Sequence, residues 1–215
     1  MQLKYKSYWR KSGLKGKWGN IFLERLSKHN PKNVLEIGVF CGVTARNICD
    51  FLYKKNNINF SYIGVDLFGS DKAQKKDEIE PTFLKNQKFS NLLKNIYYNY
   101  ILKENLNSIE SVKKLLKKYS QNIKLIAGDT NKVLKKIDLQ KIDFVFLDGG
   151  HSYETVTNDL SILYASMKDQ KKVILCDDYG KESHISEVEK AINDFTKKKN
   201  LKFNLIENRF VEIIT

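Results

Sequence analysis

A chain of 215 residues, 41% of them hydrophobic, is long enough to bury a continuous core without disulfides or a structural metal. Its 38 basic and 25 acidic residues give a formal net charge of +13, which is compatible with binding to nucleic acid, to a membrane surface or to an anionic substrate. No stretch approaches the roughly 18 apolar residues that a membrane span needs, and the first 20 residues contain no apolar run typical of a signal peptide.

The cysteines indicate the cellular compartment, and the residues that carry the positive charge indicate the kind of ligand. Cys41, Cys49 and Cys176 follow neither a disulfide nor a metal-ligand spacing, so we expect reduced thiols in a cytoplasmic protein. The positive charge comes mostly from scattered short lysine runs, which are typical of solvated helix faces. Arginine, the residue preferred for bidentate recognition of phosphate or guanine, is sparse. The charge therefore indicates an anionic ligand only weakly, and nucleic acid is not the expected partner.

Helical patterns and short apolar runs alternate along the chain. An amphipathic helix is predicted from about residue 18 to an end near residues 29–31, an apolar strand over 34–39 and a helix over 44–54. Four more strands are predicted at residues 62–66, 124–127, 144–147 and 173–176. Four more helices are predicted at residues 109–119, 130–137, 153–166 and 184–199. Nearly all strand residues are apolar, as in a parallel sheet covered on both faces. The predicted fold class is therefore α/β, a doubly wound Rossmann-like sheet.

Two segments depart from this alternation. Residues 201–206 and 209–214 predict two strands joined by a tight turn, and because a hairpin is antiparallel, the sheet is expected to end with one reversed strand. The lysine- and asparagine-rich segment at about 69–108 is too long for one crossover and predicts a helical insertion, which would be a lid, a dimer contact or decoration. We expect residues 1–215 to form a single domain. The sequence leaves open whether the first twenty residues, with Trp9 and Trp18, cover the site or frame a dimer.

Glycines and acids follow the first three strands, at the edge where ligands bind in open parallel sheets. Gly38 and Gly42 come after Glu36, and their spacing fits neither a dinucleotide-binding motif nor a nucleoside triphosphate loop. Asp66 ends the second strand, where a carboxylate can accept both hydroxyls of a ribose. Asp129 follows the third strand and would either flank an adenine or cap a helix. These residues fit a cofactor that carries a ribose and no phosphates.

Three acids and one histidine follow the next two strands. Asp148 comes after residues 144–147, and Asp177 and Asp178 come after residues 173–176. Three neighbouring carboxylates raise one another's pKa unless a cation joins them, and oxygen ligands favour Mg²⁺. The alternative is that one of the two adjacent acids caps a helix or binds substrate without a metal. His151 is suited to act as a general base, and Tyr179 is expected to wall the pocket.

The motifs VLEIGVFCG, YIGVDLFG, LIAGD, FVFLDGGHSY and VILCDDYG resemble, in order and spacing, those of class I S-adenosylmethionine-dependent methyltransferases. The sequence is most similar to methyltransferase family 24 and the related macrocin-type sugar O-methyltransferases, over about residues 33–195. The resemblance implies a divalent metal that holds two vicinal sugar hydroxyls. Gly150 is a departure, because relatives often have Asp-Gly-Asp-His at this point, and it puts the identity of the general base in doubt.

The resemblance assigns a role to each candidate site residue. The residues expected to bind S-adenosylmethionine are Glu36, Gly38, Gly42, Asp66, Asp129 and Asp148. The expected metal ligands are Asp148, Asp177 and Asp178. The expected catalytic residues are Asp148 and His151.

We therefore expect a cytoplasmic O-methyltransferase that acts on a hydroxylated small molecule, a sugar or glycan precursor, with the help of Mg²⁺ or another divalent metal. One alternative is a catechol-type enzyme, although its Asp-Ala-Asp-Lys and Asp-Asn motifs are absent. A second is an RNA ribose methyltransferase, which would show a continuous basic groove beside the cofactor. A third is a non-catalytic module that only binds the cofactor. The acceptor, the position methylated and a homodimeric state are left open.

Overall fold

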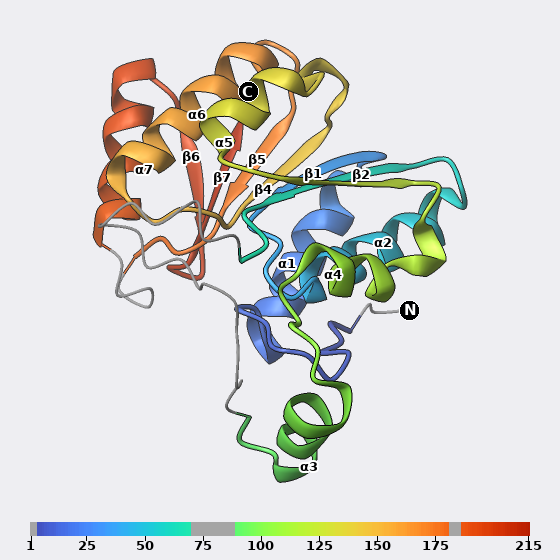
Figure 1. Ribbon diagram of the computed structural model, residues 1–215. Helices are drawn as coiled ribbons and strands as arrows, with labels where there is room; N and C mark the ends of the chain where they lie inside the picture. The colour runs from blue at the N-terminus through green and yellow to red at the C-terminus, as the bar shows by residue number, and fades with distance from the viewer. Residues whose placement is uncertain (1–3, 70–88, 181–185) are drawn as a thin grey trace.

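Seven strands of the described chain form one sheet with helices on both faces (Figure 1). The computed structural model describes residues 4–69, 89–180 and 186–215. The strand order is β3-β2-β1-β4-β5-β7-β6. The strands are β1 (Asn33–Ile37), β2 (Ser61–Asp66), β3 (Ile123–Ala127), β4 (Phe144–Leu147), β5 (Val173–Cys176), β6 (Phe203–Ile206) and β7 (Phe210–Ile214).

Strands β1 to β5 are parallel, and β7 is the reversed strand. It pairs antiparallel with both β5 and β6, so the predicted hairpin and the mostly parallel sheet are confirmed. The reversed strand does not form the edge, however, because β7 lies between β5 and the edge strand β6. The hairpin therefore brings the turn residues before β7 next to the end of β5.

The helices form one layer on each face of the sheet. Helices α1, α2 and α4 pack on one face and α5, α6 and α7 on the other, and alternate strand residues supply the two cores. In β1, for example, Val34 packs toward α2 while Leu35 and Ile37 pack toward α6. The long helices are α1 (Gly16–His29), α2 (Val43–Asn56), α6 (Tyr153–Met167) and α7 (Ser186–Lys199). The short helices are α3 (Leu92–Ile96), η2 (Tyr97–Leu102), α4 (Ile109–Leu115), η3 (Lys117–Tyr119), α5 (Thr130–Val133), η4 (Leu134–Lys136) and η5 (Leu139–Lys141).

Local signals explain where several helices begin and end. Ser152 caps α6 by accepting a hydrogen bond from the Thr155 N–H at 3.3 Å. Asn30 ends α1 in the left-handed conformation, with φ of 44°, before a proline. Two predicted helices are shorter than expected, because the patterns at 109–119 and 130–137 each divide into an α-helix and a 3₁₀ turn. None of the described helices has the length and apolarity needed to cross a lipid bilayer.

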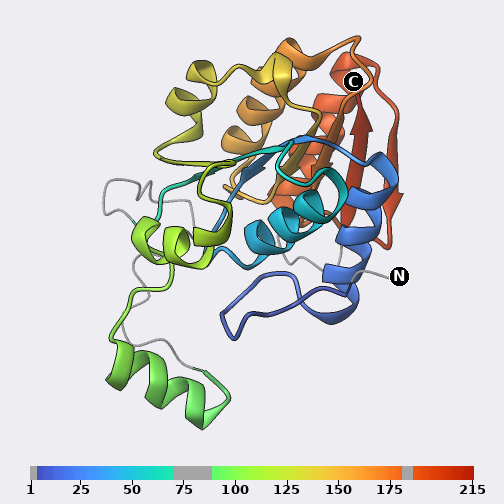
Figure 2. The same cartoon turned by 90° about the vertical axis from the view of Figure 1, so that its right-hand side faces the viewer.

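The N-terminal residues and the predicted insertion lie on the α2 side of the molecule. The Tyr5 hydroxyl contacts Thr44 Oγ1 at 2.7 Å and the Lys6 N–H donates to Asn47 Oδ1 at 2.9 Å, which fixes the first residues along α2. Part of the predicted insertion, residues 70–88, lies outside the described residues. Its described part is helical: α3 and η2 form one continuous segment that projects away from the sheet and its two helical layers (Figures 1 and 2).

Candidate active site

The strand order reverses between β1 and β4, and the loops that follow these two strands are in direct contact. The Asp148 N–H donates to the Ile37 carbonyl at 2.8 Å. Gly38 has a φ of 90°, and a Cβ at this position would lie only 1.7 Å from the Asp148 carbonyl oxygen. Glycine is therefore required here by the close approach of two backbones. The contact brings the predicted cofactor loop beside the predicted catalytic loop.

Residues 38–42, which follow β1 and contain Gly38 and Gly42, form a loop that we call the glycine loop. Asp66, at the end of β2, holds this loop in position. Its Oδ2 accepts hydrogen bonds from the Val39 N–H at 2.7 Å and the Phe40 N–H at 2.8 Å. Its Oδ1 accepts a third, from the Phe68 N–H at 2.6 Å. Burial raises the pKa of Asp66, while these backbone hydrogen bonds lower it. Positioning this loop was not foreseen from the sequence, and the contact of Asp66 with a ribose stays a prediction.

Gly42 and Asp129 have structural roles in the described chain. Gly42 precedes α2 with a φ of 75°, and a Cβ there would lie 3.0 Å from the Val112 side chain, so the glycine permits α4 to pack closely. Asp129 is the N-cap of α5, since its Oδ1 accepts the Asn131 N–H at 2.9 Å. Of the two roles considered for Asp129, the structure shows the helix cap. The cofactor contacts of both residues stay predictions.

Glu36 lies inside the molecule. It is 1% exposed and lies on the α2 face of the sheet, since it alternates with Leu35 and Ile37, which pack on the other face. Its Oε2 accepts a hydrogen bond from the Tyr62 hydroxyl at 2.5 Å, and its Oε1 has no hydrogen-bond partner in the described part of the chain. Burial is the main cause that raises its pKa from 4.5 to about 8. Glu36 is therefore a buried acid that binds a proton near neutral pH.

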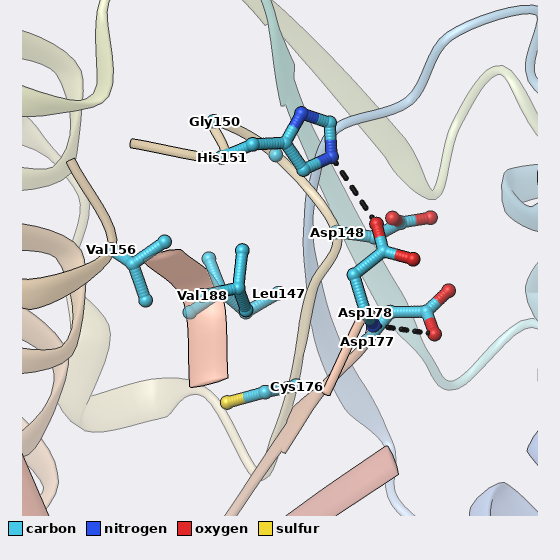
Figure 3. Close-up of a pocket in the computed structure, with 10 residues that line it drawn as sticks. Leu147, Asp148, Gly150, His151, Val156, Cys176, Asp177, Asp178 and Val188 are labelled. Atoms are coloured by element: carbon cyan, nitrogen blue, oxygen red, sulfur yellow. Dashed lines mark hydrogen bonds and ion pairs between the residues drawn. The ribbon is translucent and has the colours of Figure 1, made fainter. Parts of the chain in front are cut away.

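The acids that follow β4 and β5 meet in one pocket, as predicted from their positions in the chain. Asp148, His151, Asp177 and Asp178 all line it, and Figure 3 shows the three carboxyl groups gathered beside the imidazole. Val156 and Val188 form part of its apolar wall. Burial, together with the charges of Asp177 and Asp178, raises the pKa of Asp148 well above its usual range. A cluster of this kind needs a compensating positive charge.

That charge comes from Arg209, which the sequence analysis missed. Its Nε and Nη2 donate to the two oxygens of Asp177 at 2.6 and 2.8 Å, and Nη2 lies 3.9 Å from Asp178 Oδ1. The Asp177 side chain is 1% exposed and that of Arg209 is 16% exposed. The guanidinium also lies over the Trp18 ring, 5.3 Å from its centroid, so Trp18 contacts the arginine that pairs with Asp177. Arg209 comes directly before β7, the neighbour of β5, and it is one of only four arginines in the chain.

The pair changes the metal prediction. Asp177 Oδ1 also accepts the Asp178 N–H at 2.8 Å, so both oxygens of Asp177 already accept hydrogen bonds. Within residues 4–69, 89–180 and 186–215, no group of three histidine, cysteine or acidic side chains could hold a metal ion. Arg209 thus supplies a cation at the predicted triad, and the metal-ligand roles of Asp148, Asp177 and Asp178 stay predictions.

His151 is held by Asp178. The imidazole Nε2 lies 3.2 Å from Asp178 Oδ2, and both side chains are partly exposed to the pocket. Asp178 adopts a left-handed conformation with φ of 60°, an unfavourable backbone for a non-glycine residue, which aims its carboxylate at the histidine. Tyr179 does not line the pocket: it is 8% exposed, packs in the core beneath α7 and donates to Asn193 Oδ1 at 2.9 Å. That expectation was wrong because Gly180 and the hairpin turn Tyr179 inward, where its N–H donates to the Arg209 carbonyl at 2.9 Å.

A family model described as a methyltransferase domain, methyltransferase family 24, matches residues 35–179. No curated protein is significantly similar in sequence. Among solved structures, the SAH-bound methyltransferase PaMTH1 of Podospora anserina has a TM-score of 0.59 at 14% identity, with 93% of this chain and 79% of that chain covered. The O-methyltransferase of Bacillus cereus, in complex with SAH, has a TM-score of 0.58 at 11% identity, with coverages of 97% and 85%.

A third solved structure is the calicheamicin methyltransferase CalS11. It has a TM-score of 0.62 at 14% identity, with 90% of this chain and 77% of that chain covered. Its apo structure is described as that of a TDP-rhamnose 3′-O-methyltransferase. At these identities the likeness to solved structures shows a shared fold.

Proposed function

The chain belongs to the methyltransferase family whose model covers residues 35–179, and from this premise we propose that it transfers a methyl group from S-adenosylmethionine to a hydroxyl oxygen of a small molecule. The observation that carries the proposal is the pair of His151 and Asp178 in a pocket that adjoins the glycine loop across Gly38. A positioned base beside a cofactor loop is what alkylation of an alcohol requires.

We propose a sugar hydroxyl as the acceptor group. The motifs that follow β4 and β5 resemble those of sugar O-methyltransferases, and CalS11, which shares the fold, is described as acting on a TDP-linked rhamnose. The excess of lysine suits an acceptor that carries phosphate. These points support a hydroxylated, anionic small molecule rather than a polymer.

The residues of the chain have separable tasks in this reaction. S-adenosylmethionine, when bound, supplies a methyl group activated by a positively charged sulfur. His151, paired with Asp178, accepts the proton of the sugar hydroxyl. The oxygen forms its bond to the methyl carbon as the carbon–sulfur bond breaks, and the proton goes to His151. Asp178 then stabilises the imidazolium, and S-adenosylhomocysteine (SAH) leaves.

Arg209 supplies the charge that a metal would otherwise provide. It neutralises Asp177 and lies 3.9 Å from Asp178, which leaves His151 as the second cationic group of the pocket during turnover. We therefore propose that methyl transfer proceeds without an added divalent cation. The expected rate is the same in EDTA as in Mg²⁺.

Isothermal titration with SAH tests the proposed function first. We expect stoichiometric binding in the micromolar range, followed by SAH release from S-adenosylmethionine when nucleotide-linked sugars are supplied. Binding without turnover on any hydroxylated acceptor would favour the non-catalytic module. An absence of heat at two temperatures would contradict the proposal altogether.

Replacing Asp66 by alanine is expected to weaken SAH binding by roughly 10- to 150-fold, the range that corresponds to a charge-assisted hydrogen bond of about 1.5–3 kcal/mol. The loss has two routes, because Asp66 is predicted to bind the ribose and it holds the Val39 and Phe40 N–H groups. Asp138→Ala is the control, since Asp138 is a half-exposed acid that pairs with Lys141 at 2.9 Å and has no assigned role in the cofactor site. Unchanged affinity in Asp66→Ala would contradict its assignment to the cofactor site.

Replacing His151 by glutamine is expected to lower kcat by roughly 10²- to 10⁴-fold, because the general base is lost while the pocket keeps a side chain of similar size. SAH affinity, measured by titration, is expected to stay within about twofold of the wild type, since His151 pairs with Asp178, which follows β5. A large loss of SAH affinity with little change in kcat would instead make His151 a cofactor-binding residue.

A further inference from the structure

The segment formed by α3 and η2, residues 92–102, carries an exposed apolar surface. Leu92, Leu93, Tyr100 and Ile101 expose 71%, 67%, 69% and 66% of their surfaces. Ile96, Tyr97 and Leu102 are exposed as well. Large apolar side chains that gather in this way on a projecting element usually mark an interaction site. Figure 2 shows the segment standing clear of both helical layers, so this surface is not covered by the described residues.

The opposite side of the segment attaches it to the body of the protein. Tyr98 is 7% exposed and stacks on Phe89, with ring centroids 5.2 Å apart. It packs in one cluster with Cys41 and Leu106, close to the glycine loop. The segment is therefore held with its apolar side facing outward, rather than folded back onto a core.

Trp9 extends the apolar surface onto the N-terminal loop. It is 48% exposed, and its ring lies 6.0 Å from that of Tyr97 in an edge-to-face contact. The Lys94 ammonium lies 5.7 Å from the centroid of Trp9. Exposed tryptophan and tyrosine beside lysine are the side chains that favour the boundary between lipid and water, where an apolar ring and a polar group are both solvated.

The positive charge around this surface favours an anionic partner. Residues 89–103 contain two basic side chains, Lys94 and Lys103, and no aspartate or glutamate. Lys11, which lies over the Phe89 ring, and Lys94 and Lys103 flank the apolar side chains. A second copy of the chain would bring the same positive charges into contact, in a protein with a net charge of +13. A surface of anionic phospholipid attracts the lysines and receives the apolar side chains.

We propose that residues 92–102, together with Trp9, dock the protein on an anionic lipid surface. Leu92, Leu93, Tyr100 and Ile101 enter the acyl boundary, and the lysines contact the headgroups. Docking is separate from methyl transfer, so it is tested by binding alone.

Co-sedimentation with phosphatidylcholine vesicles, with and without phosphatidylglycerol, tests this proposal. We expect the wild type to bind the anionic vesicles, to bind the neutral vesicles more weakly and to dissociate as salt is raised. Leu93→Glu is expected to weaken binding at least about tenfold, since it removes a leucine that the lipid would bury and adds a charge that anionic headgroups repel. Ile58→Glu is the matched control: Ile58 is also 67% exposed, but it precedes the amino end of β2, and its variant is expected to bind as the wild type does.

Three outcomes would overturn the proposal. The first is a wild type that binds anionic and neutral vesicles equally or binds neither. The second is equal vesicle binding by Leu93→Glu and Ile58→Glu. The third is a wild-type dimer, seen by sedimentation, that dissociates in Leu93→Glu, which would assign the surface to a second copy. Unchanged SAH titration and circular dichroism of the variants show that they are folded, and keep this test distinct from that of the proposed function.

Discussion

Arg209→Met is expected to lower the free energy of unfolding by about 3–5 kcal/mol, the cost of leaving one partner of a buried ion pair uncompensated. Asp177 is almost fully buried, and in the described chain its carboxylate has no other cationic partner within hydrogen-bond distance. Guanidinium denaturation measures the change, which corresponds to a fall in Tm of about 10 °C for a chain of this length. Methyl transfer is expected to fall as well, because the charges of Asp148 and Asp178 would lose their neighbouring cation.

Three further variants separate the ion pair from a general loss of packing. Arg209→Lys keeps the charge but not the two parallel hydrogen bonds, so we expect an intermediate loss. The double variant Arg209→Met with Asp177→Asn is expected to recover much of the stability, since the buried Asp177 carboxylate is no longer left without its partner. Arg25→Met is the control: Arg25 pairs with Glu24, whose side chain is 67% exposed, and such a pair contributes at most about 1 kcal/mol. Equal effects in Arg25→Met and Arg209→Met would contradict the role of Arg209.

Glu36 is expected to make the protein less stable as the pH rises. Its pKa is raised from 4.5 to about 8 in the folded protein, first by burial, so the folded state binds a proton that the unfolded state releases. The stability it contributes is complete below about pH 4.5 and is lost as the pH passes through about 8. At about 1.4 kcal/mol for each pKa unit, this interval corresponds to about 5 kcal/mol.

The difference between the wild type and Glu36→Gln isolates this effect, because other buried carboxylates also titrate. Glutamine keeps an acceptor for the Tyr62 hydroxyl and cannot ionise. Denaturation at about pH 5 is expected to give similar stabilities for the two proteins, and at about pH 8 the variant is expected to be more stable by several kcal/mol. A constant difference across this range would mean that Glu36 is ionised in the folded protein.

The apolar strands explain why the sheet could be predicted from the sequence. Runs such as 144–147 and 173–176 are buried on both faces, and a pattern of this kind leaves few alternatives to a parallel sheet. The convergence of Asp148, His151, Asp177 and Asp178 followed from the same reasoning, since carboxyl ends of neighbouring parallel strands share an edge. Helix ends were less predictable, because the patterns at 109–119 and 130–137 do not show where an α-helix gives way to a 3₁₀ turn.

The partners of the acids could not be predicted in the same way. Asp177 and Arg209 are 32 residues apart, and their pairing depends on β7 lying beside β5 rather than at the sheet edge. Likewise, Asp66 accepts hydrogen bonds from the backbone N–H groups of Val39 and Phe40. Such a contact cannot be read from the sequence, because almost every residue has a backbone N–H. The carboxylates were identified correctly as a cluster, but the guanidinium that balances Asp177 was not foreseen, because Arg209 stands in the hairpin turn before β7.

The position of Arg209 also has a consequence for synthesis of the protein. Translation produces the strands in the order β1 to β7, so Asp148, Asp177 and Asp178 leave the ribosome before Arg209 does. Until β7 inserts between β5 and β6, the nascent chain exposes the side of β5 together with an acidic cluster that has no arginine to balance it. Completion of the pocket lined by Asp148, Asp177 and Asp178 therefore coincides with insertion of the hairpin. A chain arrested before Arg209 would have these acids without the cation that balances Asp177.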